Sequence, residues 1–259
     1  MTIVSKAKRR TAEALRRAIQ GIEEGGSPGR PRLPLGVPEI DRALPGGGLR
    51  AGCVHEVTGD EAATGFCAAL LARAGGGGPG GGEGRGGSLL WLARGDDLYA
   101  PGLVRYGIGA GGLLVVSGLH RQADMLWAME EALRCRAVRG VVAETGGIGL
   151  AAGRRLMLAA EGTGVLGLML AREGGGKRGG VGVAASRWRV TAVPGGLERA
   201  EKDGTRWRVE LQHCRGGRPA EWTVVWEDDG YGLSWRSRLP ARHISSSAIS
   251  PSSASRRSR

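Results

Sequence analysis

The chain has 259 residues, of which 41% are hydrophobic, so it is long and apolar enough for one sizeable core. Its longest apolar runs, such as residues 165–171, are too short to cross a bilayer, and its basic N-terminus is not followed by a continuous apolar segment, so we expect neither a membrane protein nor a secretory signal. Of the net charge of +12, residues 1–32 carry +5 and residues 241–259 carry +4. These basic ends suit an anionic partner such as DNA, although an arginine-rich composition alone would also produce them.

Helix and strand patterns alternate along most of the chain. Residues 5–22 have apolar side chains at helical spacing and predict a helix, residues 25–34 read as a linker, and the glycine-rich residues 75–87 predict a mobile loop. We expect strands at 53–57, 88–93, 113–117, 141–144 and 165–171, with helices between them at 61–74, 97–106, 121–137 and 150–161.

Apolar strands that alternate with helices predict an α/β fold, with a mainly parallel sheet and helices on both faces. After residue 180 the pattern changes to alternating segments such as RWRVTAV, RWRVELQH and EWTVVWE, which predict antiparallel strands. We therefore divide the chain into a basic helix and linker (1–32), an α/β core (33–180), antiparallel strands (181–240) and a disordered basic tail (241–259) that has too few apolar residues to fold.

The four cysteines are scattered, and we interpret them as buried free thiols of a reducing compartment: Cys53, Cys67, Cys135 and Cys214. Two short pairs, Cys53 with His55 and His213 with Cys214, could each form half of a metal site. No matching second half is visible in the sequence, so we expect no metal.

The turn before helix 61–74 lies where an ATPase would carry its phosphate-binding loop, G-x-x-x-x-G-K-[ST]. Gly59 occupies the first glycine position, and Thr64, Gly65 and Phe66 then take the places of the second glycine, the lysine and the hydroxyl. With one residue inserted, Gly65 fits the second glycine, but Phe66 and Cys67 follow it. In either alignment the phosphate-binding cation and the Mg²⁺ ligand are missing, so we predict no cofactor and no catalytic residue.

The sequence around this turn nevertheless resembles RecA and its RadA and KaiC relatives. The likeness runs from LPLGVPEIDRALPGGGLRAGCVHEVTG (33–59) through LLWLARGDDLYAPGLVRYGI to VLGLMLA, covering residues 33–172. Near Gly95 those enzymes would carry a catalytic glutamate, whereas we interpret Asp96 and Asp97 as helix caps. Glu144 stands where that family has a metal-linked aspartate, and without the lysine we expect it only to form hydrogen bonds at the sheet end.

With the C-terminal pattern RWRV…RWRVELQHCRGGRPAEWTVVWED, residues 33–236 look like the ImuA proteins. That resemblance implies a cytoplasmic scaffold in SOS-induced mutagenesis. Its implied partners are RecA, an ImuB-type protein and an error-prone polymerase, and it implies no catalytic residue.

Tryptophan and arginine recur in the C-terminal segments, which leaves three interpretations open. The tryptophans could pack inward from a half-buried sheet, form a protein interface, or stack on single-stranded DNA. The candidate contact residues, including those of the GGGKRGG loop, are Lys177, Arg178, Arg187, Arg189, Arg206, Arg208, Trp222, Trp226 and Trp235.

The sequence therefore favours a non-catalytic RecA-like adaptor of translesion synthesis. One alternative is an active RecA-type, DNA-dependent ATPase, and the missing lysine argues against it. Another is an SOS-linked inhibitor of cell division, and the long C-terminal strand region argues against that one.

Overall fold

The computed structural model describes residues 31–76, 87–109, 111–172, 183–193, 205–228, 233–237 and 242–243. The predicted helix 5–22, most of the glycine-rich loop, the GGGKRGG loop and nearly all of the tail lie outside these residues. Within the described part of the chain, no helix combines the length and the apolar character needed to cross a membrane.

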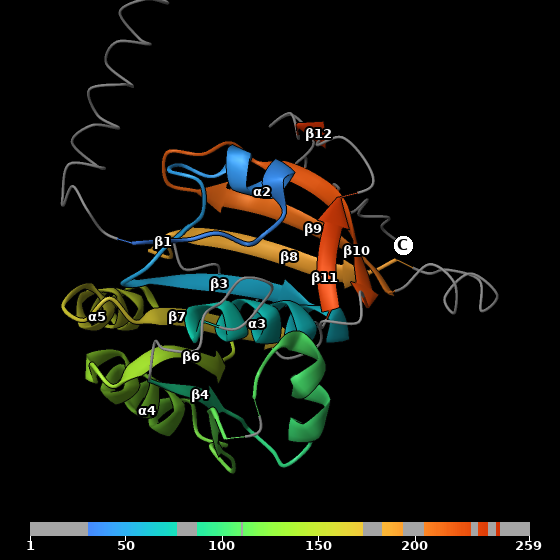
Figure 1. The fold of residues 1–259 in the computed structure, drawn as a ribbon. Coiled ribbons are helices and arrows are strands. Elements are labelled where there is room, and N and C mark those ends of the chain that lie inside the picture. The colour runs from blue at the N-terminus through green and yellow to red at the C-terminus, as the bar shows by residue number, and fades with distance from the viewer. Residues whose placement is uncertain are drawn as a thin grey trace, which may run out of the picture.

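A ten-stranded sheet forms the centre of the molecule (Figure 1). Its strands run in the order β11-β10-β9-β8-β3-β7-β6-β4-β5, with β12 beside β10. Their bounds are β3 Cys53–Gly59, β4 Ser88–Leu92, β5 Leu113–Val116, β6 Val138–Glu144, β7 Leu166–Arg172, β8 Ser186–Ala192, β9 Thr205–Cys214, β10 Ala220–Asp228, β11 Leu233–Ser237 and β12 Arg242–His243. A separate small sheet pairs β1 (Arg32–Leu33) with β2 (Leu49–Arg50).

The strands from β8 to β5 are parallel, and those from β8 outward to β11 are antiparallel. This confirms the predicted fold class, a mainly parallel sheet extended by antiparallel strands. One detail is corrected. Strand β8 was predicted to be purely antiparallel, but it pairs parallel with β3 on one side and antiparallel with β9 on the other.

Two apolar layers cover the two faces of the sheet. On one face, α3 (Glu61–Ala74) packs with the 3₁₀ helix η1 (Ala100–Tyr106) and with α2 (Pro38–Ala43), a short helix that the sequence analysis missed. On the other face lie α4 (Gln122–Arg134) and α5 (Leu150–Glu161). Helix α3 is buried on almost every side, from Ala62 to Ala72, because it lies between the sheet and η1. This central helix begins directly after β3, at the predicted phosphate-loop position.

The cysteine prediction is only partly correct. Cys53 and Cys67 are buried, but Cys214 is half-buried and Cys135 is exposed. Cys135 caps the C-terminal end of α4, where the chain leaves the helix at the surface.

Candidate functional site

The turn from β3 into α3 contains a single residue, Asp60, and this residue's carboxylate closes the helix N-terminus. The Ala62 N–H donates to Asp60 Oδ1 at 2.9 Å. The Ala192 N–H, at the end of β8, donates to both carboxylate oxygens, at 3.2 and 2.9 Å. The position that would hold an anionic phosphate at a helix N-terminus therefore holds an anion of the chain itself.

Strand β8 also fills the space beside this turn. Gly59 has φ +147°, and a Cβ atom built on it would lie 1.7 Å from the carbonyl oxygen of Val190. Thr58 Oγ1 donates to the carbonyl oxygen of Trp188 at 3.1 Å, which fastens the same two strands together. The glycine at the first loop position thus allows close strand packing.

The other three residues of the predicted degenerate loop belong to helix α3. Phe66 is fully buried, with its ring centroid 5.7 Å from that of Trp188. A Cβ atom on Gly65 would lie 2.7 Å from Tyr106 Oη and 2.8 Å from the Trp207 ring. Thr64 is half-buried in the same helix. These positions pack the helix onto the sheet and do not form a loop.

Glu144, at the end of β6, has the hydrogen-bonding role predicted for it. Trp91 Nε1 donates to Glu144 Oε1 at 3.1 Å, and the Arg94 N–H donates to Oε2 at 3.2 Å. The Arg94 guanidinium donates to the Glu144 carbonyl oxygen at 3.0 Å and to Gln122 Oε1 at 2.6 Å. The sequence analysis missed Arg94 and Gln122. The only sequence feature that could have pointed to them is their position: Arg94 follows the strand that ends at Leu92, and Gln122 is the first residue of α4.

A cavity of about 430 Å³ opens at this carboxyl edge of the parallel strands, where ligands bind in open α/β sheets. Arg94, Asp97, His120, Glu144 and Thr145 contribute its polar lining. Burial, and secondarily the charge of Glu144, raise the pKa of the Cys67 thiol, so this neighbouring cysteine stays protonated. The cavity can hold a small polar molecule, but the helix N-terminus of α3 does not offer it a free phosphate cradle.

The two aspartates near this cavity are not helix caps, contrary to the prediction. Helix η1 begins at Ala100, and its N-cap is Tyr99, which makes no side-chain capping bond. Both Asp96 and Asp97 are exposed, and Asp97 lines the cavity. Pro101 allows η1 to start after them, because a proline fits the first turn of a helix.

Of the two Cys–His pairs that were considered as half of a metal site, the first has its histidine ring in other hydrogen bonds. The Nε2 atom of His55 lies 3.0 Å from the Arg50 carbonyl oxygen, and Nδ1 lies 2.7 Å from Ser186 Oγ. Trp188 Nε1 also donates to Ser186 Oγ, at 2.7 Å. Among the described residues, no three His, Cys, Asp or Glu side chains are grouped as a metal site would require.

The C-terminal strands separate their tryptophans from their arginines. Trp188, Trp207 and Trp222 are at most 2% exposed and pack in the core layer that contains α3. This is the inward-packing interpretation, and Trp222 is therefore inaccessible as a contact residue. Trp226 and Trp235 are partners in the β10–β11 register, while Lys177 and Arg178 lie outside the described residues.

The four predicted arginines lie on the opposite side of these strands from the buried tryptophans and are half-buried or exposed. Arg187 Nε lies 2.8 Å from Glu56 Oε2, and Arg208 Nε lies 3.4 Å from Glu221 Oε1. Arg189 is directly across from Glu210 in the β8–β9 register, and Arg206 occupies β9. The result is a charged sheet face, which we call the arginine face: Arg187, Arg189, Arg206 and Arg208.

Comparison with known proteins decides the family. Protein ImuA of Caulobacter vibrioides, from strains NA1000 / CB15N and ATCC 19089 / CIP 103742 / CB 15, is 39% identical over 227 residues, which cover 82% of this chain and 90% of the relative. The chain belongs to the ImuA family. This confirms the resemblance predicted from the sequence.

The fold of this ImuA-family chain also has a solved structural neighbour. A KaiC-like protein of Pyrococcus horikoshii OT3 superposes with a TM-score of 0.51 at 15% identity, over 80% of this chain and 99% of the archaeal one. At this identity the likeness shows the fold alone, and it confirms the RecA-like architecture. No protein-family model matches the chain.

Proposed function

We propose that this protein is a non-catalytic RecA-like adaptor in SOS-induced, error-prone translesion DNA synthesis, linking an ImuB-type protein and an error-prone polymerase to RecA or damaged DNA. Membership of the ImuA family supports the process. The observation that carries the non-catalytic part is the Asp60 carboxylate at the N-terminus of α3.

The energetics of phosphate binding support this proposal. Phosphoryl transfer depends on cations that neutralise the developing negative charge. Here a carboxylate stands at the helix N-terminus, and a phosphate charge about 4 Å from it would be repelled by about 4 kcal/mol at an effective dielectric constant of about 20. Binding a triphosphate at this turn would first require Asp60 to leave the hydrogen bonds with Ala62 and Ala192.

The adaptor role needs surfaces for partners, and we propose the arginine face as one of them. Two of its side chains, Arg187 and Arg208, are paired with acids that can exchange for those of a partner, as in other charged interfaces. Trp222 is removed from the set because it is buried. The remaining proposed contacts are Lys177, Arg178, Arg187, Arg189, Arg206, Arg208, Trp226 and Trp235.

Complementation of cells that lack the gene tests the proposal. Wild-type protein and Glu144→Gln should both restore damage-induced mutation frequency, because glutamine keeps an acceptor for Trp91 and an adaptor needs no acid for Mg²⁺. Both should co-purify with the ImuB-type protein. If Glu144→Gln is folded and present at the wild-type level but does not restore mutagenesis, the carboxylate has a role that an adaptor does not need, and the proposal is contradicted.

A further inference from the structure

Helix α5 carries an outward stripe that nothing in the described structure covers. Leu150, Arg154 and Leu158 are spaced at i, i+4 and i+8, which places them along one side of the helix. Leu150 is 53% exposed and Leu158 is 68% exposed, and Arg154 is also exposed. The stripe therefore presents a cation between two apolar side chains.

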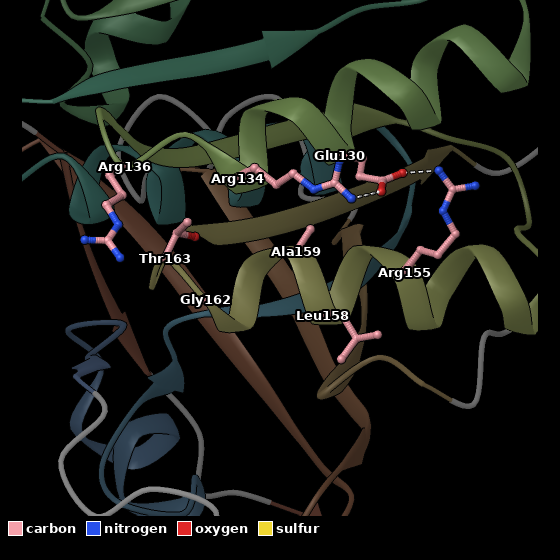
Figure 2. Close-up of a pocket in the computed structure, with 8 residues that line it drawn as sticks. All are labelled: Glu130, Arg134, Arg136, Arg155, Leu158, Ala159, Gly162 and Thr163. Atoms are coloured by element: carbon pink, nitrogen blue, oxygen red, sulfur yellow. Dashed lines mark hydrogen bonds and ion pairs between the residues drawn. The ribbon is translucent and has the colours of Figure 1, made fainter.

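One flank of the stripe is a groove of about 500 Å³ between α4 and α5 (Figure 2). In its floor, Glu130 is 5% exposed and lies between two arginines, with Arg134 Nη2 at 2.6 Å from Oε1 and Arg155 bonded to Oε2. Arg136 lines the other end of the groove, near Thr163, so the groove has three arginines and one carboxylate in its lining. Leu158 forms the edge of this groove on α5.

The other flank is a second groove, of about 270 Å³, between α5 and the start of β3. Arg50, Arg154 and Arg215 line it, together with one acid, Glu161. Leu158 borders this groove as well. The exposed leucine is thus a ridge between two grooves, each with more arginines than carboxylates.

We propose that the stripe Leu150–Arg154–Leu158, with its two arginine-lined grooves, is a docking surface for an acidic segment of a partner protein that also carries apolar side chains. Excess positive charge in both grooves is complementary to carboxylates. The two leucines offer apolar contact on either side of Arg154. A second copy of this chain is a poor match, because its net charge is +12.

A nucleic acid fits the same surface less well. A DNA strand could place phosphates at the arginines of either groove, but its sugar–phosphate backbone would leave the two exposed leucines without apolar contact. An acidic peptide can place a carboxylate at each arginine and an apolar side chain on Leu158.

Site-specific photocrosslinking in cells tests this surface. The probe is the full-length protein with Leu158→p-benzoylphenylalanine, irradiated in cells with and without DNA damage, and the crosslinked segment is identified by mass spectrometry. We expect a protein segment with several acidic residues beside apolar ones. Adding Arg154→Glu to the probe should lower the crosslink yield at least about tenfold, because a desolvated charge pair becomes a repulsion.

Two matched controls use exposed residues on the opposite face. In the first control, p-benzoylphenylalanine replaces Val104 on η1, which is 53% exposed. In the second, Arg42→Glu replaces an arginine on α2 whose side chain is 75% exposed. We expect the Val104 probe not to capture this segment and Arg42→Glu not to reduce its yield. Thermal unfolding of each variant checks that it is folded.

Several results would overturn the inference: no crosslink in either condition, a crosslink to DNA or to a second copy, or a yield that Arg154→Glu leaves unchanged. The inference rests on the proposed adaptor role only in that an adaptor needs docking surfaces, and the two can fail separately. If the crosslinked partner is acidic but unrelated to DNA damage, the docking surface is supported and the proposed function is contradicted.

Discussion

Among single residues, Asp60 decides which group occupies the N-terminus of α3. It follows β3, caps α3 and accepts a hydrogen bond from Ala192 of β8, so one carboxylate links the helix N-terminus to a neighbouring strand. In a nucleotide-binding relative of this fold, phosphate oxygens accept hydrogen bonds from the N-terminal amides of the helix. Here the Asp60 side chain accepts the hydrogen bond from the Ala62 N–H instead.

Asp60→Ala should destabilise the protein by about 1 kcal/mol or slightly more, because the N-cap acceptor is lost together with the bond from β8. Urea unfolding measures the change as a lower transition midpoint. Asp60→Asn is the matched control, since its amide oxygen still accepts, and it should lose much less. Equal midpoints for wild type and Asp60→Ala would refute the capping role.

His55 provides a pH-dependent contribution to stability. Burial first, and then the charges of Arg50 and Arg32, lower the pKa of His55 to about 4. The ring is neutral in the folded protein: Nε2–H donates to the Arg50 carbonyl oxygen, and Nδ1 accepts from Ser186. In the unfolded chain the imidazole binds a proton near pH 6.5, so acid favours unfolding.

We expect the free energy of unfolding to fall as pH drops below 6.5, with a His55 share of about 3 kcal/mol by pH 4. The measurement is urea unfolding at pH 7 and at pH 4.5 for wild type and His55→Gln. The variant should be less stable at pH 7 but should lose less stability between the two pH values. Parallel losses in both proteins would show that other groups cause the acid sensitivity.

At the scale of elements, the periodicity of the core was enough to predict α3 and all five parallel strands of the core. Apolar runs in strands buried on both faces leave little ambiguity. Helix α2 was missed because its six residues are too few for a periodic signal. The parallel pairing of β8 was missed because RWRV alternates in the same way whichever neighbour the strand has.

A bulge shows a second limit of pattern reading. Strict alternation along β9 would place His213 on the inward face with Trp207 and Leu211, but His213 is exposed and Cys214 packs against the core. The β8–β9 register shifts beside Trp188, so Gln212 is an extra residue and the following side chains change faces. The position of a bulge depends on the partner strand, which one strand's sequence does not reveal.

The packing of α3 on the sheet allows a direct test of the element. Alanine is favoured over glycine in a helix by about 1 kcal/mol, but a Cβ atom at Gly65 would overlap Tyr106 and the rigid Trp207 ring. Overpacking costs about 1–3 kcal/mol, so Gly65→Ala should lower the midpoint of urea unfolding.

Gly162→Ala is the matched control at the end of α5, where φ is −75° and the added methyl group meets open space. It should leave stability unchanged or raise it by about 0.4–1 kcal/mol. If Gly65→Ala is as stable as Gly162→Ala, α3 and β9 do not pack as closely at Gly65 as described here.

At the scale of the whole molecule, a RecA-like sheet continues without a break into the antiparallel strands (Figure 1). Strand β8 joins the two parts, and its residues both shape the β3–α3 turn and carry two arginines of the arginine face. The sequence pattern shows only that the lysine of a phosphate-binding loop is replaced. It could not show that Asp60 and β8 occupy the turn, because Ala192 is 132 residues away along the chain.

Calorimetric titration of Mg–ATP into the full-length protein tests the central claim most directly. We expect no binding heat up to about 1 mM nucleotide, which corresponds to a binding free energy weaker than about −4 kcal/mol. Adding single-stranded DNA to the protein solution in the calorimeter should not change this result. Saturable, Mg²⁺-dependent binding of ATP that is lost in Glu144→Gln would contradict the account.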